Sequence, residues 1–378
     1  MNITKVLTGI LFAVTCAMQP GLTQPLDQIK PRNSEFEKLG LPRRLIAIDN
    51  VCAWPNLTML KDSTIIATIY NQPNHGYFEG DAECWSSQDK GLTWEYSGTP
   101  TNHAPFTNRM NVAAGINQMG ELVVLCSGWD KINPRRNSES KPLTSTISIS
   151  KDGGRTWEVG GLMPPPVVGL SEHVPFSDII VAENGDLVVG TYAFEMRDKM
   201  TPANQRKGHI YLLRSEDNGK SWNKVIPIIK GTHVEAAILH IGKGKWLSVS
   251  RRFGHLDLDI HKSDDDGFTW EHVSVLGIPK VSSAHLLQLS DGRIMLSYGN
   301  RSLGNKGIDV RISNDQGITW SSPQRILDLK ESRDLGYPAA LEFDNGQIVI
   351  AYYSSGIQQH DRYHMGVVNL HISELIEY

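Results

Sequence analysis

Two side chains that could react together, the carboxyl group of Glu235 and the phenol of Tyr337, occupy equivalent places in a repeated pattern. Each lies nine residues before the glycine of a tight turn. Side chains alternate along a strand with period two, so equal spacing predicts that both face the same way. Arg251 and Arg301 follow at the ends of the next predicted strands. A carboxylate can take a proton from a phenol, and guanidinium groups hold anions, so the four side chains predict one functional pocket.

The same spacing in the other repeat units gives further residues that should face this pocket. They are Trp54, Asn111, Phe176 and Ser283. Two positions before Asn111, Arg109 is a candidate for an additional guanidinium group. Arg252 directly follows Arg251, so the two side chains should point in opposite directions and at most one should enter the pocket.

The elements that must position these residues recur along the chain. An eight-residue pattern, Ser-x-Asp-x-Gly-x-Thr/Ser-Trp, occurs five times. Its Asp can accept hydrogen bonds from nearby backbone amides and its Gly permits a positive φ, so each copy predicts a turn. The Trp then begins a strand and can bury a large ring. The copies begin at Ser87, Ser150, Ser215, Ser263 and Ser313.

A shorter turn followed by an apolar strand occurs six times, and a copy of the eight-residue pattern follows each of the first five. These turns are centred on Ser63, Gly120, Gly185, Gly244, Gly292 and Gly346. The resulting four-stranded unit is typical of a propeller blade. We therefore expect an all-β fold, a six-bladed β-propeller of four-stranded antiparallel blades. Residues 44–48 should supply the outer strand of the last blade and so close the ring.

The eight-residue patterns are similar to the Asp boxes of the sialidase (neuraminidase) superfamily, which has a six-bladed propeller fold. Glu235-Ala236-Ala237-Ile238, followed by Arg251, resembles the strand that bears the partner Glu and a substrate-binding Arg. Arg301 resembles another member of the arginine triad, and Gly336-Tyr337-Pro338 resembles the segment of the nucleophilic Tyr.

This resemblance implies a retaining exo-glycoside hydrolase that removes a terminal acidic sugar, sialic acid or a related one, from a glycan or oligosaccharide. Tyr337 would be the nucleophile, Glu235 its base, and Arg251 and Arg301 the clamp for the sugar carboxylate. A carboxylate nucleophile would be repelled by that group, which explains the use of a neutral phenol. A second acid must protonate the leaving oxygen.

The first repeat unit departs from the family pattern. The Arg-Ile-Pro motif that usually supplies the first triad arginine is replaced by Ala53-Trp54-Pro55, and Arg109 could compensate for the loss. The usual acid/base Asp has no clear counterpart in the loop 71–81, where His75, Glu79 and Asp81 are the candidates. A uronic acid or another keto-acid sugar is therefore an alternative to sialic acid.

Two other functions fit the same propeller. One is a polysaccharide lyase or an atypical glycosidase that uses His75 or Tyr337 as acid/base at a uronic acid. The other is a non-catalytic carbohydrate-binding propeller, in which Trp54 and the arginines bind sugar. Three long polar loops, residues 99–108, 131–142 and 196–209, would select the neighbouring sugar if they lie on the pocket rim.

The first residues have the pattern of an export signal. Lys5 precedes an apolar run over residues 6–18, which is too short to span a bilayer as a helix. We expect a signal peptide over residues 1–24, an N-terminal extension over 25–39 and the propeller over 40–378, in a secreted or periplasmic protein without a membrane span. Lipid attachment at Cys16 is disfavoured by the preceding Ala13-Val14-Thr15.

Composition excludes several classes of protein. The chain has 378 residues, of which 40% are hydrophobic and 21% charged, unlike a disordered, collagenous or coiled-coil protein. Its net charge of −4 argues against a nucleic-acid partner. The histidines lack metal-ligand spacing and no phosphate-binding loop is present, so we expect neither metal nor cofactor. Cys52, Cys84 and Cys126 should be buried thiols rather than a disulfide framework.

Overall fold

The fold is a ring of four-stranded antiparallel sheets. The computed structural model describes residues 43–133, 135–137, 139–196, 207–252, 257–278, 280–357 and 360–375. The predicted signal peptide, the N-terminal extension and Cys16 lie outside these residues. Among the described residues, no helix has the length and hydrophobicity needed to cross a membrane.

The first three blades follow one another along the chain. Blade one contains β2 (Cys52–Met59), β3 (Ile65–Tyr70), β4 (Ala82–Ser87) and β5 (Glu95–Thr101). Blade two contains β6 (Asn111–Ile116), β7 (Leu122–Ser127), β8 (Thr146–Ser150) and β9 (Glu158–Val159). Blade three contains β10 (Val174–Val181), β11 (Leu187–Phe194), β12 (Gly208–Ser215) and β13 (Lys224–Ile229).

The last three blades repeat this order, and the sixth takes its outer strand from the start of the propeller. Blade four contains β14 (His233–Gly242), β15 (Lys245–Arg252), β16 (Leu258–Ser263) and β17 (Glu271–Val275). Blade five contains β18 (Val281–Gln288), β19 (Ile294–Asn300), β20 (Gly307–Ser313) and β21 (Gln324–Asp328). Blade six contains β22 (Asp334–Glu342), β23 (Gln347–Ser355), β24 (His364–His371) and β1 (Arg43–Asp49). The 3₁₀ helix η3 (Ile372–Glu374) follows β24.

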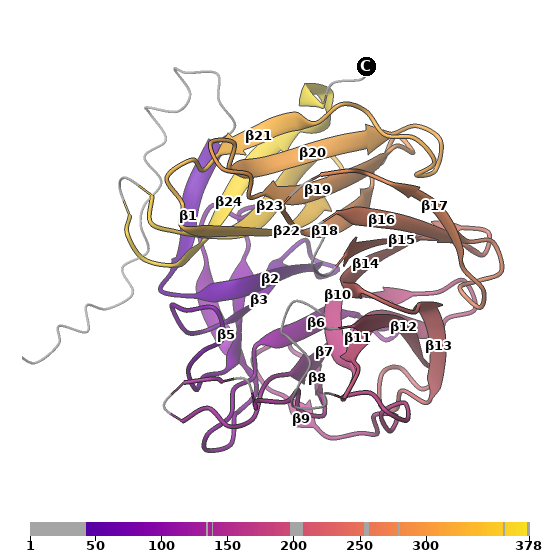
Figure 1. Cartoon of the computed structure of the whole chain (residues 1–378). Helices are drawn as coiled ribbons and strands as arrows, with labels where there is room; N and C mark the ends of the chain where they lie inside the picture. Colours follow the sequence, from indigo (N-terminus) through magenta and orange to yellow (C-terminus); the bar gives the residue numbers. More distant parts are fainter. Residues whose placement is uncertain are drawn as a thin grey trace, which may run out of the picture.

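The first strands of the blades surround the propeller axis. β2, β6, β10, β14, β18 and β22 contact one another in a closed cycle. Figure 1 shows these strands around the middle and the fourth strands at the periphery. Blades two and three are joined more closely, because β6 and β10 pair in parallel at Ala113 with Ser177 and Ala114 with Asp178. The arrangement is the expected β-propeller.

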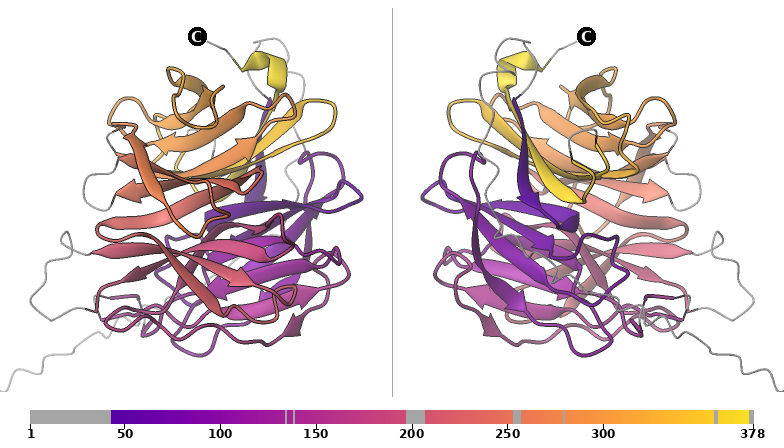
Figure 2. Two further views of the ribbon diagram at one scale, coloured as in Figure 1. Left: turned by 90° about the vertical axis from the view of Figure 1, so that its right-hand side faces the viewer. Right: turned by 90° about the vertical axis from the view of Figure 1, so that its left-hand side faces the viewer.

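The ring is closed by the pairing of β1 with β24. The two strands run antiparallel, with Ile46 opposite Gly366 and Ile48 opposite Met365. They lie side by side in both views of Figure 2, although they come from opposite ends of the chain. The prediction that residues 44–48 complete the last blade is therefore confirmed.

Each eight-residue motif forms a turn around its Asp. In the fifth copy, Asp315 accepts hydrogen bonds from the backbone N–H of Thr319 at 2.9 Å and from its hydroxyl group at 2.6 Å. The Ser313 hydroxyl donates to Asp315 and accepts from the N–H of Gly317, each at 2.8 Å. Gly317 adopts a φ of 86°, and its carbonyl accepts from the indole of Trp320 at 3.1 Å. The motif thus links two strands through side-chain contacts.

The cysteines belong to the packed interior. Cys52, Cys84 and Cys126 are buried free thiols, as expected from the sequence. Burial raises the pKa of Cys84 and of Cys126 to about 12, so both remain protonated. They pack as small hydrophobic side chains.

Candidate active site

Glu235 on β14 and Tyr337 on β22 are in direct contact. The Tyr337 hydroxyl donates a hydrogen bond to Glu235 Oε1 at 2.9 Å, and both residues are buried. The blade between them contributes Ser283, whose hydroxyl donates to the other oxygen of Glu235. The sequence prediction that the acid and the phenol meet is confirmed.

Backbone irregularities aim both side chains. Glu235 has a φ of 57° and Tyr337 a φ of 51°, and each lies where the register of its strand shifts. A positive φ is uncommon for such residues, and bulges often re-aim side chains next to active sites. The Tyr337 N–H donates to the Ser282 hydroxyl at 3.1 Å. A Cβ on Gly336 would lie 2.3 Å from that oxygen, so this close approach requires glycine.

Arg251 determines the charge state of the pair. Its Nε and Nη2 donate to Glu235 Oε2 at 2.9 and 2.6 Å. Burial would raise the pKa of Glu235, but the charge of Arg251 and the hydrogen bonds from Ser283, Arg251 and Tyr337 outweigh it, so the pKa lies below its ordinary value. Burial and the negative charge of Glu235 raise the pKa of Tyr337. A carboxylate therefore faces a protonated phenol.

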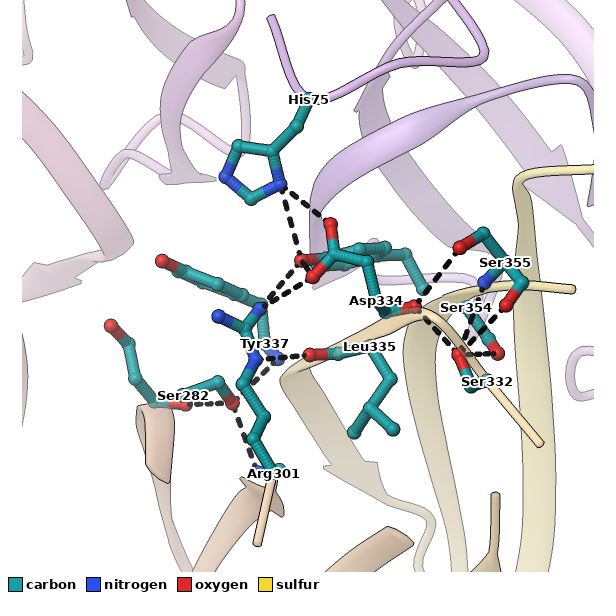
Figure 3. A network of polar contacts seen from close by, with 12 residues as sticks. His75, Ser282, Arg301, Ser332, Asp334, Leu335, Tyr337, Ser354 and Ser355 are labelled. Atoms are coloured by element: carbon teal, nitrogen blue, oxygen red, sulfur yellow. Dashed lines mark hydrogen bonds and ion pairs between the residues drawn. The ribbon is translucent and has the colours of Figure 1, made fainter. Parts of the chain in front are cut away.

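Asp334, at the start of β22, organises a second cluster that sequence reasoning missed. Its carboxylate lies 2.9 Å from His75 Nδ1 and 3.2 Å from Arg301 Nη2, and accepts from Tyr353 at 3.0 Å and Tyr363 at 3.1 Å. Burial would raise the pKa of Asp334. The hydrogen bond with His75 and the charges of His75 and Arg301 outweigh burial and lower the pKa to about 2. Figure 3 shows the second ring nitrogen of His75 on the side away from Asp334.

Arg301 connects this cluster to the phenol. Its Nε donates to the carbonyl of Leu335 at 2.8 Å and its Nη2 to the hydroxyl of Tyr353 at 2.7 Å. The guanidinium carbon lies 5.5 Å from the centre of the Tyr337 ring. Figure 3 shows the side chain of Arg301 rising beside Tyr337 towards Asp334. The two predicted arginines therefore both lie next to the Glu235–Tyr337 pair.

An open cavity of about 470 Å³ lies next to these groups. Of the residues predicted from the sequence, it is lined by Trp54, His75, Glu235, Arg251, Arg301 and Tyr337. The Trp54 ring centre lies 4.9 Å from that of Tyr337 and 5.4 Å from that of His75. Asn111 is buried behind the wall, where its amide donates to the hydroxyl of Tyr192 at 3.4 Å.

Two candidates for the acid/base residue do not line this cavity. Asp81 accepts hydrogen bonds from the backbone and ring of His103, and Glu79 Oε2 lies 3.5 Å from the same ring. The expectation that either acts at the pocket is wrong for this arrangement, because the loop turns them towards His103. Of the three candidates, His75 is the one in the cavity.

Two predicted arginines also lie elsewhere. Arg109 donates to the carbonyl groups of Cys126 and Thr144, at 3.4 and 3.0 Å, so it does not supply the compensating guanidinium. Arg252 Nε lies 3.9 Å from Asp259, while Arg251 enters the cavity. The prediction that at most one of the adjacent pair enters is confirmed.

A second wall, made by other lining residues, was not predicted residue by residue. It is formed by Tyr77, Trp129, Arg136, Asn137, Ser140, Tyr192 and Phe194. Three of these residues come from the polar loop 131–142, one of the loops that would select the neighbouring sugar if they lie on the pocket rim. The length of this loop was the feature of the sequence that pointed to the pocket rim. Its individual residues could not be predicted, because no strand register specifies which side chains of a loop face inward.

The family model of a BNR repeat-like domain matches residues 129–350. This span covers more than half of the chain and contains Glu235, Arg251, Arg301 and Tyr337. The chain belongs to the sialidase superfamily. In this superfamily member, the matched span carries both residues of the acid–phenol pair.

Two sequence relatives bear the name sialidase. The protein of Paraclostridium sordellii is 24% identical over 231 residues, 57% of this chain and 56% of the relative. That of Bacteroides fragilis (strain YCH46) is 25% identical over 393 residues, 94% of this chain and 69% of the relative. This superfamily member thus spans little more than half the length of the first relative.

A solved structure supports the fold of this superfamily member. A Hadza microbial sialidase matches 86% of this chain and 66% of its own, with a TM-score of 0.68 and 19% identity. Likeness at this level of identity establishes the shared fold.

Proposed function

We propose that this protein is a sialidase-like exo-glycoside hydrolase that removes a terminal acidic sugar with retention of configuration. The observation that carries the proposal is the hydrogen bond between Tyr337 and Glu235 inside an arginine-lined cavity. A phenol next to an ionised carboxylate is an activated nucleophile. It also avoids the repulsion that a carboxylate nucleophile would meet at an acidic sugar.

The first step would form a covalent sugar–tyrosine intermediate. The Tyr337 oxygen bonds to the anomeric carbon while its proton passes to Glu235, and the bond to the leaving oxygen breaks. His75 would protonate that oxygen through the ring nitrogen that does not face Asp334. In the second step His75 would take a proton from water, which attacks the anomeric carbon. Glu235 would return its proton to the departing Tyr337.

The acidic group of the sugar would be held by Arg251 and Arg301. Each uses Nε and Nη2 in contacts with the protein. Among the contacts of the described residues, none involves Nη1 of either arginine, so both can offer a donor to a carboxylate. A charge-assisted pair of this kind orients the sugar above Tyr337.

The test is incubation with a panel of glycans that end in sialic acid, another keto-acid sugar or a uronic acid, with products identified by mass. We expect release of one terminal acidic sugar. Tyr337→Phe should abolish release without loss of the folded state, because only the hydroxyl is removed. Full activity of Tyr337→Phe would refute the retaining mechanism.

The pairing of His75 with Asp334 favours one second candidate, a lyase or atypical glycosidase acting at a uronic acid. A histidine held by a carboxylate can remove a proton next to the uronate group. The same panel separates the two reactions, because a lyase product carries a double bond and absorbs ultraviolet light. Binding of glycans without any product would instead support a carbohydrate-binding propeller.

We also propose that the protein is exported, on the basis of Lys5 and the apolar run over residues 6–18 alone.

A further inference from the structure

One guanidinium group of the cavity has no balancing carboxylate among the residues that the structure describes. Arg251 contacts Glu235 at 2.6 Å, and Arg301 lies 3.2 Å from Asp334. Arg136 also lines the cavity, and among the described residues it has no carboxylate partner. The net positive charge that the cavity offers to a ligand is therefore concentrated at Arg136.

Aromatic rings hold Arg136 in place. Its guanidinium carbon lies 4.7 Å from the centre of the Trp129 ring and 5.2 Å from that of Tyr77. Its backbone N–H donates to the carbonyl of Tyr77 at 2.9 Å. Such stacking fixes the plane of the guanidinium group, and Tyr77 is also a side-chain hydrogen-bond partner of Arg136. A guanidinium group has five N–H donors, so others can bind an anion. Partial burial of an unbalanced cation is costly until an anion arrives.

This cation belongs to a different wall from the reacting pair. Arg136 contacts Tyr77 and Trp129, whereas Glu235 and Tyr337 contact Arg251 and each other. The wall continues through aromatic rings, with ring centres 6.3 Å apart from Trp129 to Phe194 and 5.4 Å apart from Phe194 to Tyr192. Aromatic faces of this kind suit the apolar face of a sugar ring.

We propose that Arg136 and its aromatic neighbours form a subsite for a second anionic group, on the sugar next to the one released. The inference rests on the proposed function, in which Arg251 and Arg301 hold the first acidic group. The anion is a carboxylate of a second acidic sugar or a sulfate, since both accept paired hydrogen bonds from a guanidinium group. The preferred substrate would then be a multiply acidic glycan.

The experiment measures binding of Tyr337→Phe protein to an array of neutral, singly acidic and doubly acidic oligosaccharides. The array includes sialic acid and uronic acid termini, and the second anion is either a carboxylate or a sulfate. We expect doubly acidic glycans to bind more tightly than singly acidic ones. Adding Arg136→Gln should reduce this difference by about 10- to 100-fold, the effect of one charge-assisted contact. Comparing glycans with a second carboxylate to those with a sulfate identifies which anion the subsite prefers.

Arg135→Gln is the matched control. Arg135 also lies over the Tyr77 ring, at 4.5 Å, but it does not line the cavity. The substitution Arg135→Gln removes the same charge from the same loop and should leave the preference for doubly acidic glycans intact. Arg136→Lys should restore part of the preference because it keeps the charge.

No preference for doubly acidic glycans, including the absence of all binding, would overturn the subsite. So would a preference that survives Arg136→Gln or is lost equally in Arg135→Gln. These outcomes are separate from a failure of the proposed function, which would appear as wild-type protein that releases no sugar from the panel.

Discussion

Individual side chains in the cavity owe their ionisation states to their neighbours. Burial works against charge on Glu235, but Arg251 and the hydroxyl of Ser283 keep the carboxylate ionised. Burial, together with the same negative charge, raises the pKa of Tyr337 and keeps the phenol protonated. The proton is therefore on the phenol, the group that must lose it, and an unprotonated carboxylate oxygen is in place to accept it. This distribution is what a nucleophile with a dedicated base requires.

The role of His75 can be tested through the leaving group. His75→Gln should lower kcat/KM about 10²- to 10⁴-fold for natural glycans, whose sugar leaving group needs a proton. A nitrophenyl glycoside should be affected little, because nitrophenolate leaves without protonation. The control is His103→Gln, since His103 pairs with Asp81 and does not line the cavity. Equal losses for both substrates would exclude His75 as the general acid.

Asp334 should make the stability of the folded protein depend on pH in the acidic range. Its pKa falls from an ordinary value of 3.8 to about 2 in the folded chain. A depressed carboxyl pKa stabilises the folded state above the unfolded pKa, by about 2 kcal/mol here, and this contribution is lost as pH falls from about 4 to about 2. Urea unfolding at several pH values should show Asp334→Asn less stable than wild type at pH 7, with the gap closing towards pH 2. A difference in the free energy of unfolding that stays constant with pH would contradict the lowered pKa of Asp334.

At the scale of strands and turns, local geometry aims the site. The bulges at Glu235 and Tyr337 occur at matching places in β14 and β22, so the blades present their side chains in the same way. The eight-residue motifs act farther out, where each Asp fixes a turn between two strands. In the fifth copy, one carboxylate receives three hydrogen bonds from Ser313 and Thr319.

Removing one motif carboxylate should weaken the fold and leave the chemistry unchanged. Asp315→Ala loses these partly exposed hydrogen bonds, and we expect a loss of about 1 kcal/mol in the free energy of unfolding. The control is Ile318→Ala in the same turn, because that side chain is 54% exposed and should change stability little. Denaturant unfolding measures both variants. A large drop in kcat for correctly folded Asp315→Ala would show that the turn does more than support the blade.

At the scale of the whole molecule, closure of the ring brings the two ends of the propeller into one site. Blade one contributes Trp54 and His75, and blade six contributes Asp334 and Tyr337. These blades are neighbours in space although they stand at opposite ends of the sequence. The pairing of β1 with β24 completes blade six and so supports the site indirectly.

Ile48→Ala should show how much this closure contributes. Ile48 is 2% exposed and belongs to the core shared by blades one and six. Truncating a buried isoleucine costs about 2–4 kcal/mol, so the thermal midpoint should fall while the KM of the proposed reaction, measured on folded protein, stays unchanged. The matched change Ile318→Ala removes the same atoms from an exposed position. An unchanged midpoint in Ile48→Ala would mean that β1 adds nothing to the stability of the ring.

The sequence by itself determined the blades, the closing strand and the meeting of Glu235 with Tyr337. All three follow from repetition, because strands with the same spacing from the same turn receive the same orientation. The bulges at Glu235 and Tyr337 leave the two side chains in the same orientation, because both strands carry a bulge at the matching position. Arg251 and Arg301 were found for the same reason, as residues at the ends of equivalent second strands.

Only the tertiary structure decided which residues outside the repeated strands join the site. It placed His75 beside Asp334, two residues 259 positions apart in the sequence, and turned Glu79 and Asp81 towards His103. It also directed Arg136 into the cavity. Loops have no period from which to deduce the direction of a side chain, and their positions depend on contacts with distant parts of the chain. The repeats therefore specified the centre of the site, and folding specified its walls.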